Sequence, residues 1–323
     1  MAPSFLSAHA RYAARAAEAC GYTFRSLDGG DGYLFEVRDG ARSAVFAAGA
    51  GTPYALNDAR AASIAKDKAF CAEALRQAGV PVVPGRMFFV TKRWAEMRSP
   101  GREPDDALAF AATAQYPIFC KPISASNGLY AEAVDSAEEF ADYMTRVSRE
   151  HFAIIVQPFI RAVEYRVFVL NGRVLFSYRK TPASVRGDGV RSLGVLVAAL
   201  PREAGAPPLK PKGRNDQGRS FAANDVPARM ELVRLDGPAN RAAGGGVVDL
   251  LDGASMALTN IALEATQAIG LSLAAVDLFE HAEPRRYQVI EVNSNPMIAT
   301  LEEHQHWHLI IEIWKANFAA ALR

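Results

Sequence analysis

The chain has 323 residues, of which 50% are hydrophobic and 22% are charged. This composition excludes an intrinsically disordered protein, and the length predicts two or three packed modules. The formal net charge of +1 gives no overall attraction to nucleic acid or anionic lipid, and no apolar run is long enough to cross a membrane. Three widely spaced cysteines cannot form a disulfide scaffold or a zinc knuckle. We therefore expect a cytoplasmic protein that binds neither nucleic acid nor membranes.

The N-terminal part combines a helix with short strands. Its predicted elements are a helix over residues 5–20, strands over 22–27, 33–38 and 42–47, and a helix over 57–78. The basic start could also be an organellar presequence, but no apolar signal core follows it and Gly21 is a suitable helix end. The segment 80–85 contains two prolines, so we expect a connector there.

The middle and the C-terminal part alternate between helical and strand patterns. The predicted strands cover residues 87–90, 116–122, 130–134, 153–157, 164–170, 173–179, 273–280 and 286–292, and the predicted helices cover 105–114, 136–148, 254–269 and 305–321. Asn171-Gly172 is a strong signal for a tight hairpin, and Ser136 with Glu139 predicts a capping box. Residues 203–230 are rich in Pro, Gly and charge, which predicts a long mobile surface loop.

Three oxygen-bearing side chains lie on the two strands predicted near the C-terminus. Asp277 interrupts an otherwise apolar strand, where an unpaired carboxylate would be costly. Glu291 and Asn293 are two residues apart on the next strand, so they share one face. The side chains of Ile290 and Val292 are then expected on the opposite face. Oxygen ligands from neighbouring strands suit Mg²⁺; the alternative is a set of strand-end acids that Arg or backbone groups satisfy.

A lysine also follows a hydrophobic strand directly into a loop of small residues. Lys121-Pro122 precedes Ser124, Ser126 and Gly128, and small residues let backbone N–H groups approach a polyphosphate while the lysine supplies charge. The order differs from a Walker loop, because the lysine comes before the small residues. An exposed turn with a solvated lysine is the alternative.

A third segment leaves a hydrophobic strand through a proline-containing hinge. Gln157 and Ile160 lie in this hinge, and Glu164 follows two residues before Arg166. An extended hinge can offer backbone groups to an adenine edge, and a carboxylate beyond it can bind ribose hydroxyls. An ordinary strand end with a surface Glu/Arg pair explains the same residues.

Taken in order, these segments resemble the ATP-grasp superfamily, specifically carboxylate–amine ligases near the cyanophycin synthetases and the ribosomal-protein glutamate ligases. The resemblance covers nearly all of the chain from about residue 57, and its further motifs lie at residues 65–68, 78–81, 187–189 and 240–245. It implies an α+β fold, the ATP-grasp fold of three α/β modules, with ATP between the central and C-terminal modules. The modules expected here are a short N-terminal one over 1–65, a central lid module over 66–157 and a C-terminal module with the metal site over 158–323.

The resemblance also implies roles for individual residues. The residues that it assigns to ATP binding are Lys68, Lys121, Ser124, Ser126, Gly128, Gln157, Ile160 and Glu164. It assigns two Mg²⁺ ions, or Mn²⁺, to Asp277, Glu291 and Asn293, with Glu291 bridging. The cationic residues that it assigns to phosphoryl transfer are Arg166, Arg179, Lys180 and Arg241, for each of which a solvated surface charge is the alternative. Gln157 departs from the acid that relatives often carry in the hinge.

The implied activity is ATP-dependent amide-bond formation between an amino acid or peptide carboxylate and an amine, through an acyl-phosphate, with release of ADP and phosphate. Two alternatives stay open: a ligase that modifies a ribosomally made peptide, for which the cationic residues of the 203–230 loop would suit an acidic peptide, and a catalytically inactive nucleotide-binding regulatory protein. The N-terminal module is short for the superfamily, so substrate contacts could come from a second subunit of a homodimer.

Two further observations weigh against a nucleophilic cysteine and against a zinc site. Cys71 has no histidine near it in sequence, so we expect it to pack inside a helix rather than act as a nucleophile. His304, His306 and His308 invite a zinc interpretation, but spacings of two and four cannot place all three on one helical face. His304 or Glu303 could instead approach the amine substrate.

Overall fold

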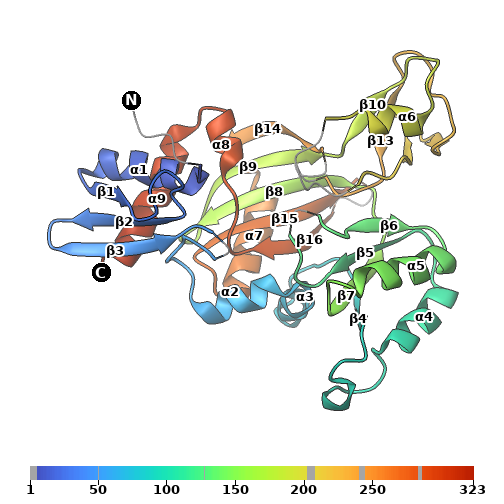
Figure 1. Cartoon of the computed structure of the whole chain (residues 1–323), viewed down its shortest axis with the longest axis horizontal. Coiled ribbons are helices and arrows are strands. Elements are labelled where there is room, and N and C mark those ends of the chain that lie inside the picture. Colours follow the sequence, from blue (N-terminus) through green and yellow to red (C-terminus); the bar gives the residue numbers. More distant parts are fainter. Residues whose placement is uncertain (1–5, 50, 127, 202–207, 240–243, 283–285) are drawn as a thin grey trace.

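The computed structural model describes residues 6–49, 51–126, 128–201, 208–239, 244–282 and 286–323. Within these ranges helices pack against four β-sheets (Figure 1), and the predicted α+β class is confirmed. None of the helices described is both long enough and apolar enough to cross a membrane.

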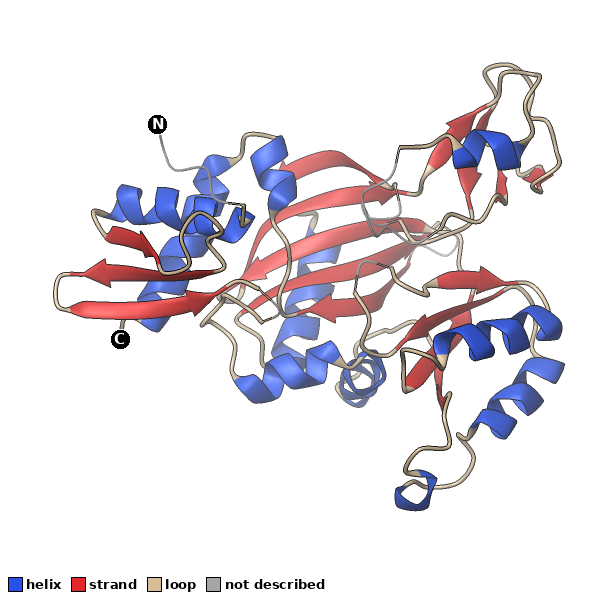
Figure 2. Cartoon of the chain, in the orientation of Figure 1, coloured by secondary structure: helices blue, strands red, loops and turns tan. Residues whose placement is uncertain are grey.

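A five-stranded sheet forms the centre of the molecule (Figure 2). Its strands, in spatial order, are β14 (Gly246–Asp252), β9 (Arg173–Thr181), β8 (Val163–Leu170), β15 (Leu273–His281) and β16 (Arg286–Asn293), and every neighbouring pair is antiparallel. The helix α7 (Met256–Ile269) packs on one face, where Val167, Val276 and Leu278 are buried. The β8–β9 hairpin turns through Asn171 and Gly172, both with positive φ, as their sequence predicts.

The N-terminal strands and the C-terminal helix share one core on the other face of this sheet. The elements of this unit are α1 (Ala8–Cys20), the sheet β1 (Thr23–Ser26), β2 (Leu34–Asp39) and β3 (Arg42–Ala47), α8 (Ala299–Glu303) and α9 (Trp307–Ala321). Trp314 of α9 is fully buried against Phe35 and Phe46, in a core that also contains Phe168 of β8. This unit covers only part of the face, and the rest lines a cavity.

A four-stranded sheet lies beside the central one. Its strands, in spatial order, are β4 (Arg86–Phe89), β7 (Ala153–Pro158), β5 (Ile118–Pro122) and β6 (Glu132–Val134), and its helices are η1 (Ala95–Met97), α4 (Pro104–Thr113) and α5 (Ala137–Val147). The connector at residues 80–85 joins the two sheets: the Val83 backbone N–H donates to Val289 of β16 at 3.0 Å, and Val289 donates back to Pro81 at 2.8 Å. The connector therefore holds the four-stranded sheet next to β16.

The prediction of a single helix over residues 57–78 is wrong. Two helices, α2 (Ala59–Lys66) and α3 (Lys68–Gln77), meet at Asp67, whose backbone is extended at φ −91° and ψ 109°. The Asp67 carboxylate accepts hydrogen bonds from the backbone N–H groups of Ala69 and Phe70, so it caps α3. The break places Lys68 at the first position of the new helix.

The loop predicted over 203–230 is interrupted, within its described residues, by two strands of two residues each, and its mobility stays a prediction. A second sheet of four short strands, called the small sheet below, lies in this region. Its strands, in spatial order, are β10 (Ser184–Arg186), β13 (Leu232–Leu235), β11 (Gly213–Arg214) and β12 (Ser220–Phe221), and α6 (Leu193–Ala198) packs on it. Phe221 and Val233 are buried in its core. Strands of two residues are too short to show alternation in the sequence, whereas Pro, Gly and charge dominate the pattern around them.

Candidate active site

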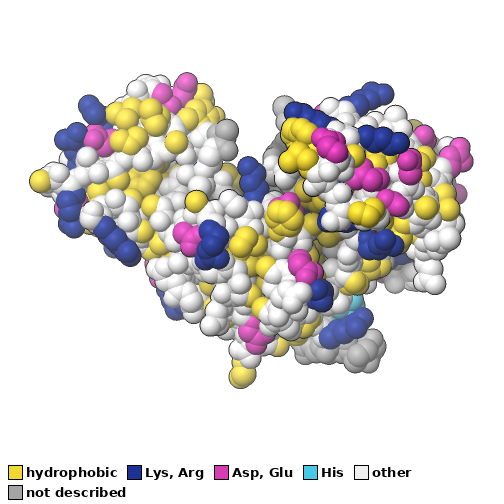
Figure 3. Space-filling view, turned by 90° about the horizontal axis from the view of Figure 1, so that it is seen from below, with side chains coloured by type: hydrophobic (Ala, Val, Ile, Leu, Met, Phe, Trp, Pro, Cys, Tyr) yellow, Lys and Arg dark blue, Asp and Glu magenta, His cyan; other side chains and the backbone are white. Residues whose placement is uncertain are grey.

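A cavity of about 1470 Å³ opens between the central sheet, the four-stranded sheet and the small sheet. Seen from below, the molecule is hollowed between its N-terminal lobe and the opposite lobe, with basic side chains in the hollow (Figure 3). Single small-ligand sites typically measure roughly 300–1,000 Å³, so this cavity has room for more than one reactant.

The three oxygen-bearing residues predicted on β15 and β16 come together at the wall of this cavity. Asp277 lies opposite Glu291 in the antiparallel register. The Asn293 Nδ2 atom lies 3.3 Å from Glu291 Oε1 and 3.5 Å from Asp277 Oδ2. The carboxylate and amide groups thus form one cluster, and Asp277 is almost completely buried.

A β-bulge in β16 changes which side chains reach the cavity. Asp277 pairs with Glu291, but the next residue, Leu278, pairs with Val289, so Ile290 has no partner in the register. Ile290 therefore lines the cavity with Glu291, whereas Val289 and Val292 are buried in the core under α7. The sequence prediction that Ile290 shares a face with Val292 is wrong, because strict alternation assumes an unbroken ladder.

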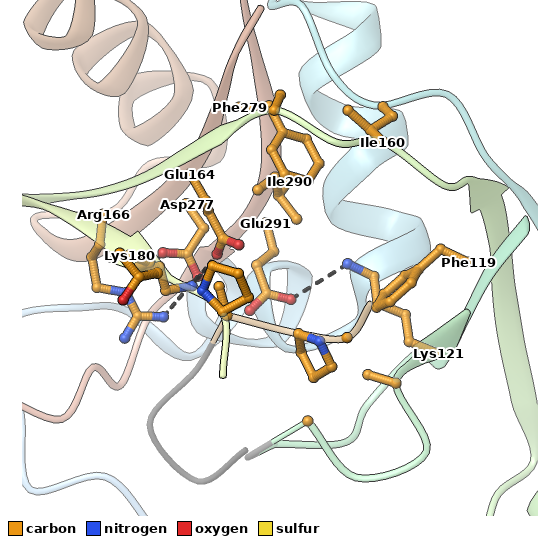
Figure 4. Close-up of a pocket in the computed structure, with 18 of the residues that line it drawn as sticks. Phe119, Lys121, Ile160, Glu164, Arg166, Lys180, Asp277, Phe279, Ile290 and Glu291 are labelled. Atoms are coloured by element: carbon orange, nitrogen blue, oxygen red, sulfur yellow. Dashed lines mark hydrogen bonds and ion pairs between the residues drawn. The ribbon is translucent and has the colours of Figure 1, made fainter. Parts of the chain in front are cut away.

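Two cations hold the Asp277 carboxylate. Arg166 lies opposite Asp277 on β8 and donates to both carboxylate oxygens at 2.7 Å, and Lys180 Nζ lies 3.3 Å from Oδ2. Lys180 also forms an ion pair with Glu164, its cross-strand neighbour. These side chains point toward one another in Figure 4. Burial alone would raise the pKa of Asp277, but Arg166 and Lys180 outweigh burial and lower it.

Two lysines face the other carboxylate. Lys68 Nζ lies 3.8 Å and Lys121 Nζ 3.7 Å from Glu291 Oε2. Burial would raise the pKa of Glu291, but the two lysines lower it to about 2, so the group is ionised. The pKa of Lys121 is lowered, because burial disfavours its charge more than Glu291 favours it. Lys68 also donates to the backbone carbonyl of Ala125 at 2.7 Å, which ties α3 to the small-residue loop.

The loop and the hinge border the same cavity. Ser126 and Gly128 line it, whereas Ser124 is not among the lining residues. Gln157 is buried and donates to the Val83 carbonyl at 3.3 Å. Ile160 and Glu164 follow along the cavity wall.

The sequence predictions missed the apolar part of the cavity. Phe119, Phe279 and Ile290 line it together with Ile160 (Figure 4). Phe279 could have been found, because it lies two residues after Asp277 and so on the same face of β15. No sequence signal marks the others, since apolar residues are expected throughout core strands.

The small sheet contributes charged residues that the sequence predictions also missed. Arg234 pairs with Asp216, and Arg161 of the hinge pairs with Asp236 at 2.8 Å; all four line the cavity. Of the remaining predicted cations, Arg179 lines the cavity and pairs with Asp249 at 2.9 Å, while Arg241 lies outside the described residues.

Other groups singled out in the sequence have different surroundings. Lys210 forms ion pairs with Glu132 and Glu139, and Lys212 with Asp135. Cys71 is buried in the core under α7, and burial raises its pKa to about 11. The packing role expected for Cys71 fits this position.

Comparison with known protein families matches residues 225–316 to the RimK-like ATP-grasp domain. The glutathione biosynthesis bifunctional protein of Mannheimia succiniciproducens is 31% identical over 215 residues, which are 58% of this chain and 28% of that protein. The corresponding protein of Desulfotalea psychrophila is 26% identical over 274 residues, or 75% of this chain and 32% of that one. The chain thus spans about a third or less of the length of these relatives.

Among solved structures, the bifunctional glutathione synthetase of Pasteurella multocida is similar to this chain with a TM-score of 0.47 and 21% identity, over 94% of this chain and 43% of that one. A D-alanine–D-alanine ligase of Bacillus anthracis has a TM-score of 0.48 and 12% identity, over 80% of this chain and 68% of that chain.

Proposed function

We propose that this chain, which carries a RimK-like ATP-grasp domain, is an ATP-dependent ligase that joins the carboxylate of an amino acid or peptide to an amine and releases ADP and phosphate. The observation that carries the proposal is the meeting of buried and half-buried carboxylates and cations at one wall of a large cavity. Such a mixture suits a ligand that brings both phosphates and metal ions.

The acidic cluster fits the magnesium ions that ATP-grasp enzymes use. Asp277, Glu291 and Asn293 offer only oxygen ligands, and Mg²⁺ is usually held by one or two carboxylates together with substrate phosphates. We propose that these three residues hold Mg²⁺, or Mn²⁺. When bound, the ions would neutralise charge on the phosphate oxygens.

The same contacts suggest how the cations are used. In this structure Arg166 and Lys180 pair with Asp277, and Lys68 and Lys121 pair with Glu291. Each lysine or arginine therefore already points at the place where the acids meet. With metal ions held by the acids, these cations would be available to phosphate oxygens, and Lys68 and Lys121 would bind the nucleotide phosphates.

The apolar side of the cavity suits a purine ring. Ile160, Phe279 and Ile290 lie together there (Figure 4), and the hinge backbone next to Gln157 offers hydrogen-bonding groups. We place the adenine between these side chains. Glu164 would bind the ribose in exchange for its present partner, Lys180, and Ser126 and Gly128 would cover the phosphates.

The reaction that follows needs charge stabilisation more than covalent chemistry. A substrate carboxylate attacks the γ-phosphate to form an acyl-phosphate, and the amine then displaces phosphate. Both steps develop negative charge on oxygens, which Arg166, Arg179 and Lys180 are placed to stabilise, with Arg241 as a further candidate. A homodimer, the three-module division at residues 65 and 157, and a cytoplasmic location remain predictions.

The proposal is tested by measuring phosphate release with ATP, Mg²⁺ and pairs drawn from a panel of amino acids and short peptides, with mass spectrometry of the product. We expect turnover with particular pairs. The variant Glu291→Gln should lose phosphate release, because it removes the charge that both lysines and the metal require. Glu264→Gln, an exposed site on α7, serves as the control and should behave as wild type.

Thermal unfolding of each variant shows whether a loss of phosphate release reflects a loss of folding. Lys68→Met is a second variant to test, at the edge of the cavity. Wild-type turnover in a folded Glu291→Gln protein would refute the metal assignment. Nucleotide binding without turnover under any pairing would instead support an inactive regulatory protein, and turnover only with longer peptides would support a peptide-modifying ligase.

A further inference from the structure

Two histidines and an aspartate meet at a place that is separate from the cavity. Asp252 is the last residue of β14, His306 directly precedes α9, and His308 is the second residue of α9. Their ligand atoms all lie within 4.8 Å of one another, and none of the three residues lines the cavity. In the described part of the chain, no other group of three His, Cys, Asp or Glu residues meets this geometric condition.

The distances within this cluster suit a shared metal ion better than hydrogen bonds. His306 Nδ1 lies 3.6 Å from Asp252 Oδ1, and His308 Nε2 lies 3.6 Å from Asp252 Oδ2. Hydrogen bonds between such atoms are roughly 2.7–3.2 Å long. Each imidazole thus faces a different oxygen of Asp252, and the three ligand atoms lie within 4.8 Å of one another. Ligands at about 2.1 Å from a tetrahedral Zn²⁺ are about 3.4 Å from each other, so small side-chain movements would bring the three groups onto one ion. In addition, His306 Nδ1 is buried and has no hydrogen-bond partner.

The backbone explains why both imidazoles reach the same point. Three histidines at spacings of two and four cannot share one helical face, which is why the sequence weighs against zinc. Only His308 belongs to α9, however, whereas His306 has φ −81° and ψ 54°. The third ligand, Asp252, comes from a strand that the sequence did not predict. His304, two residues earlier, is outside the cluster.

We propose that Asp252, His306 and His308 bind a divalent transition-metal ion of the Zn²⁺ type, with water at the open fourth position. Two imidazoles favour Zn²⁺ over Mg²⁺ or Ca²⁺, and a single carboxylate completes a ligand set that is common for zinc. The ion would join the end of the edge strand β14 to the start of α9. The site is independent of the proposed Mg²⁺ cluster, which offers oxygen ligands only.

The test is a Zn²⁺ titration of the full chain against a coloured chelator, in the presence of excess Mg²⁺ to occupy oxygen-rich sites. We expect one tightly bound equivalent. His308→Ala and Asp252→Asn should each weaken binding by about tenfold or more, whereas His304→Ala should match wild type. Bound Co²⁺ should show the intense visible absorption of a tetrahedral site, which His308→Ala removes.

The side chains of Asp252 and His308 are about two-thirds exposed, at 65% and 63%, so their substitution should leave the metal-free melting temperature unchanged. Zn²⁺ should raise the melting temperature of the wild type and of His304→Ala only. The proposal is overturned if zinc does not bind, or if it binds equally to the wild type and to both ligand variants, since the ion would then occupy a different site.

Discussion

At the scale of single residues, opposite charges meet each buried Asp, Glu and Lys side chain in the described part of the chain, namely Glu36, Lys121 and Asp277. Asp277 would be very unfavourable alone in the sheet, but its two oxygens accept from Arg166 while Lys180 lies close by. The same principle identifies the site from the sequence, because a carboxylate inside an apolar strand requires partners. It does not say which partners these are, since cross-strand neighbours depend on the register.

His9 is a buried titratable group that has no acidic partner among the described residues. It packs edge-on to Tyr12 and Tyr54, and burial lowers its pKa from 6.5 to about 4. The folded state therefore binds fewer protons than the unfolded state between these values, and stability falls as the pH drops through this range. The full contribution is about 3 kcal/mol, of which about 2 kcal/mol is lost between about pH 7 and pH 5.

We predict that His9→Phe, which keeps an aromatic ring in the cluster, removes this part of the pH dependence. Urea unfolding at several pH values measures the slope, and His304→Ala, on an exposed histidine, should keep the wild-type slope. The titration of Glu291 contributes little to the slope between pH 7 and pH 5. Its contribution to the free energy of unfolding declines only as the pH falls below the unfolded-state pKa of 4.5. An unchanged slope in His9→Phe would contradict the prediction.

At the scale of elements, the break between α2 and α3 determines where Lys68 lies. The Asp67 side chain accepts from two backbone N–H groups at the start of α3, and the Lys68 N–H donates to Ile123 at 2.8 Å. Two helical runs are therefore joined at an angle that brings a lysine to the cavity. A continuous helix would carry residue 68 past this loop.

We predict that Asp67→Ala lowers the free energy of unfolding by about 1 kcal/mol, the usual value of a helix cap, and weakens ATP binding. Asp67→Asn should retain most of both, because an asparagine oxygen can accept the same hydrogen bonds. Chemical denaturation and equilibrium nucleotide binding provide the two readouts. Equal losses in both variants would mean that the charge of Asp67, rather than its capping, matters.

Elements with regular patterns could be predicted from the sequence, and irregular ones could not. The hairpin at Asn171-Gly172 follows turn rules, and the strands that carry Asp277 and Glu291 lie where their apolar residues predict them. β14 was missed because its register shifts between Val248 and Leu251, which disrupts alternation. The bulge at Ile290 also disrupts alternation. It directs the Ile290 side chain into the cavity, and the composition of the strand gives no sign of it.

At the scale of the whole molecule, contacts between residues distant in sequence close the fold. Asn317 of α9 is fully buried, and its carboxamide donates to Pro53 at 2.9 Å and accepts from Ala55 at 2.7 Å. These hydrogen bonds join α9 to the segment between β3 and α2, and Figure 1 shows α9 packed beside the N-terminal elements. No local sequence pattern predicts this pairing, because both partners of the Asn317 side chain are backbone groups outside helices and strands.

The small sheet is attached to the four-stranded sheet by lysines. Lys210 donates to the Ala133 carbonyl at 2.7 Å and forms ion pairs with Glu132 and Glu139, and Lys212 pairs with Asp135. Both sheets border the cavity. These contacts therefore link two sheets that border the cavity.

We predict that Lys210→Met loosens this attachment by about 1 to 2 kcal/mol, so that amides of β6 and the first turn of α5 exchange hydrogen roughly 5- to 30-fold faster in the nucleotide-free protein. Lys92→Met is the matched control, because the Lys92–Asp105 pair lies near the same four-stranded sheet but is about three-quarters exposed, at 71% and 79%. Added salt should reduce the difference between wild type and Lys210→Met, since these pairs are only partly buried. If exchange in β6 is the same in both lysine variants, the small sheet is held by its other contacts, and the opening of the cavity does not depend on Lys210.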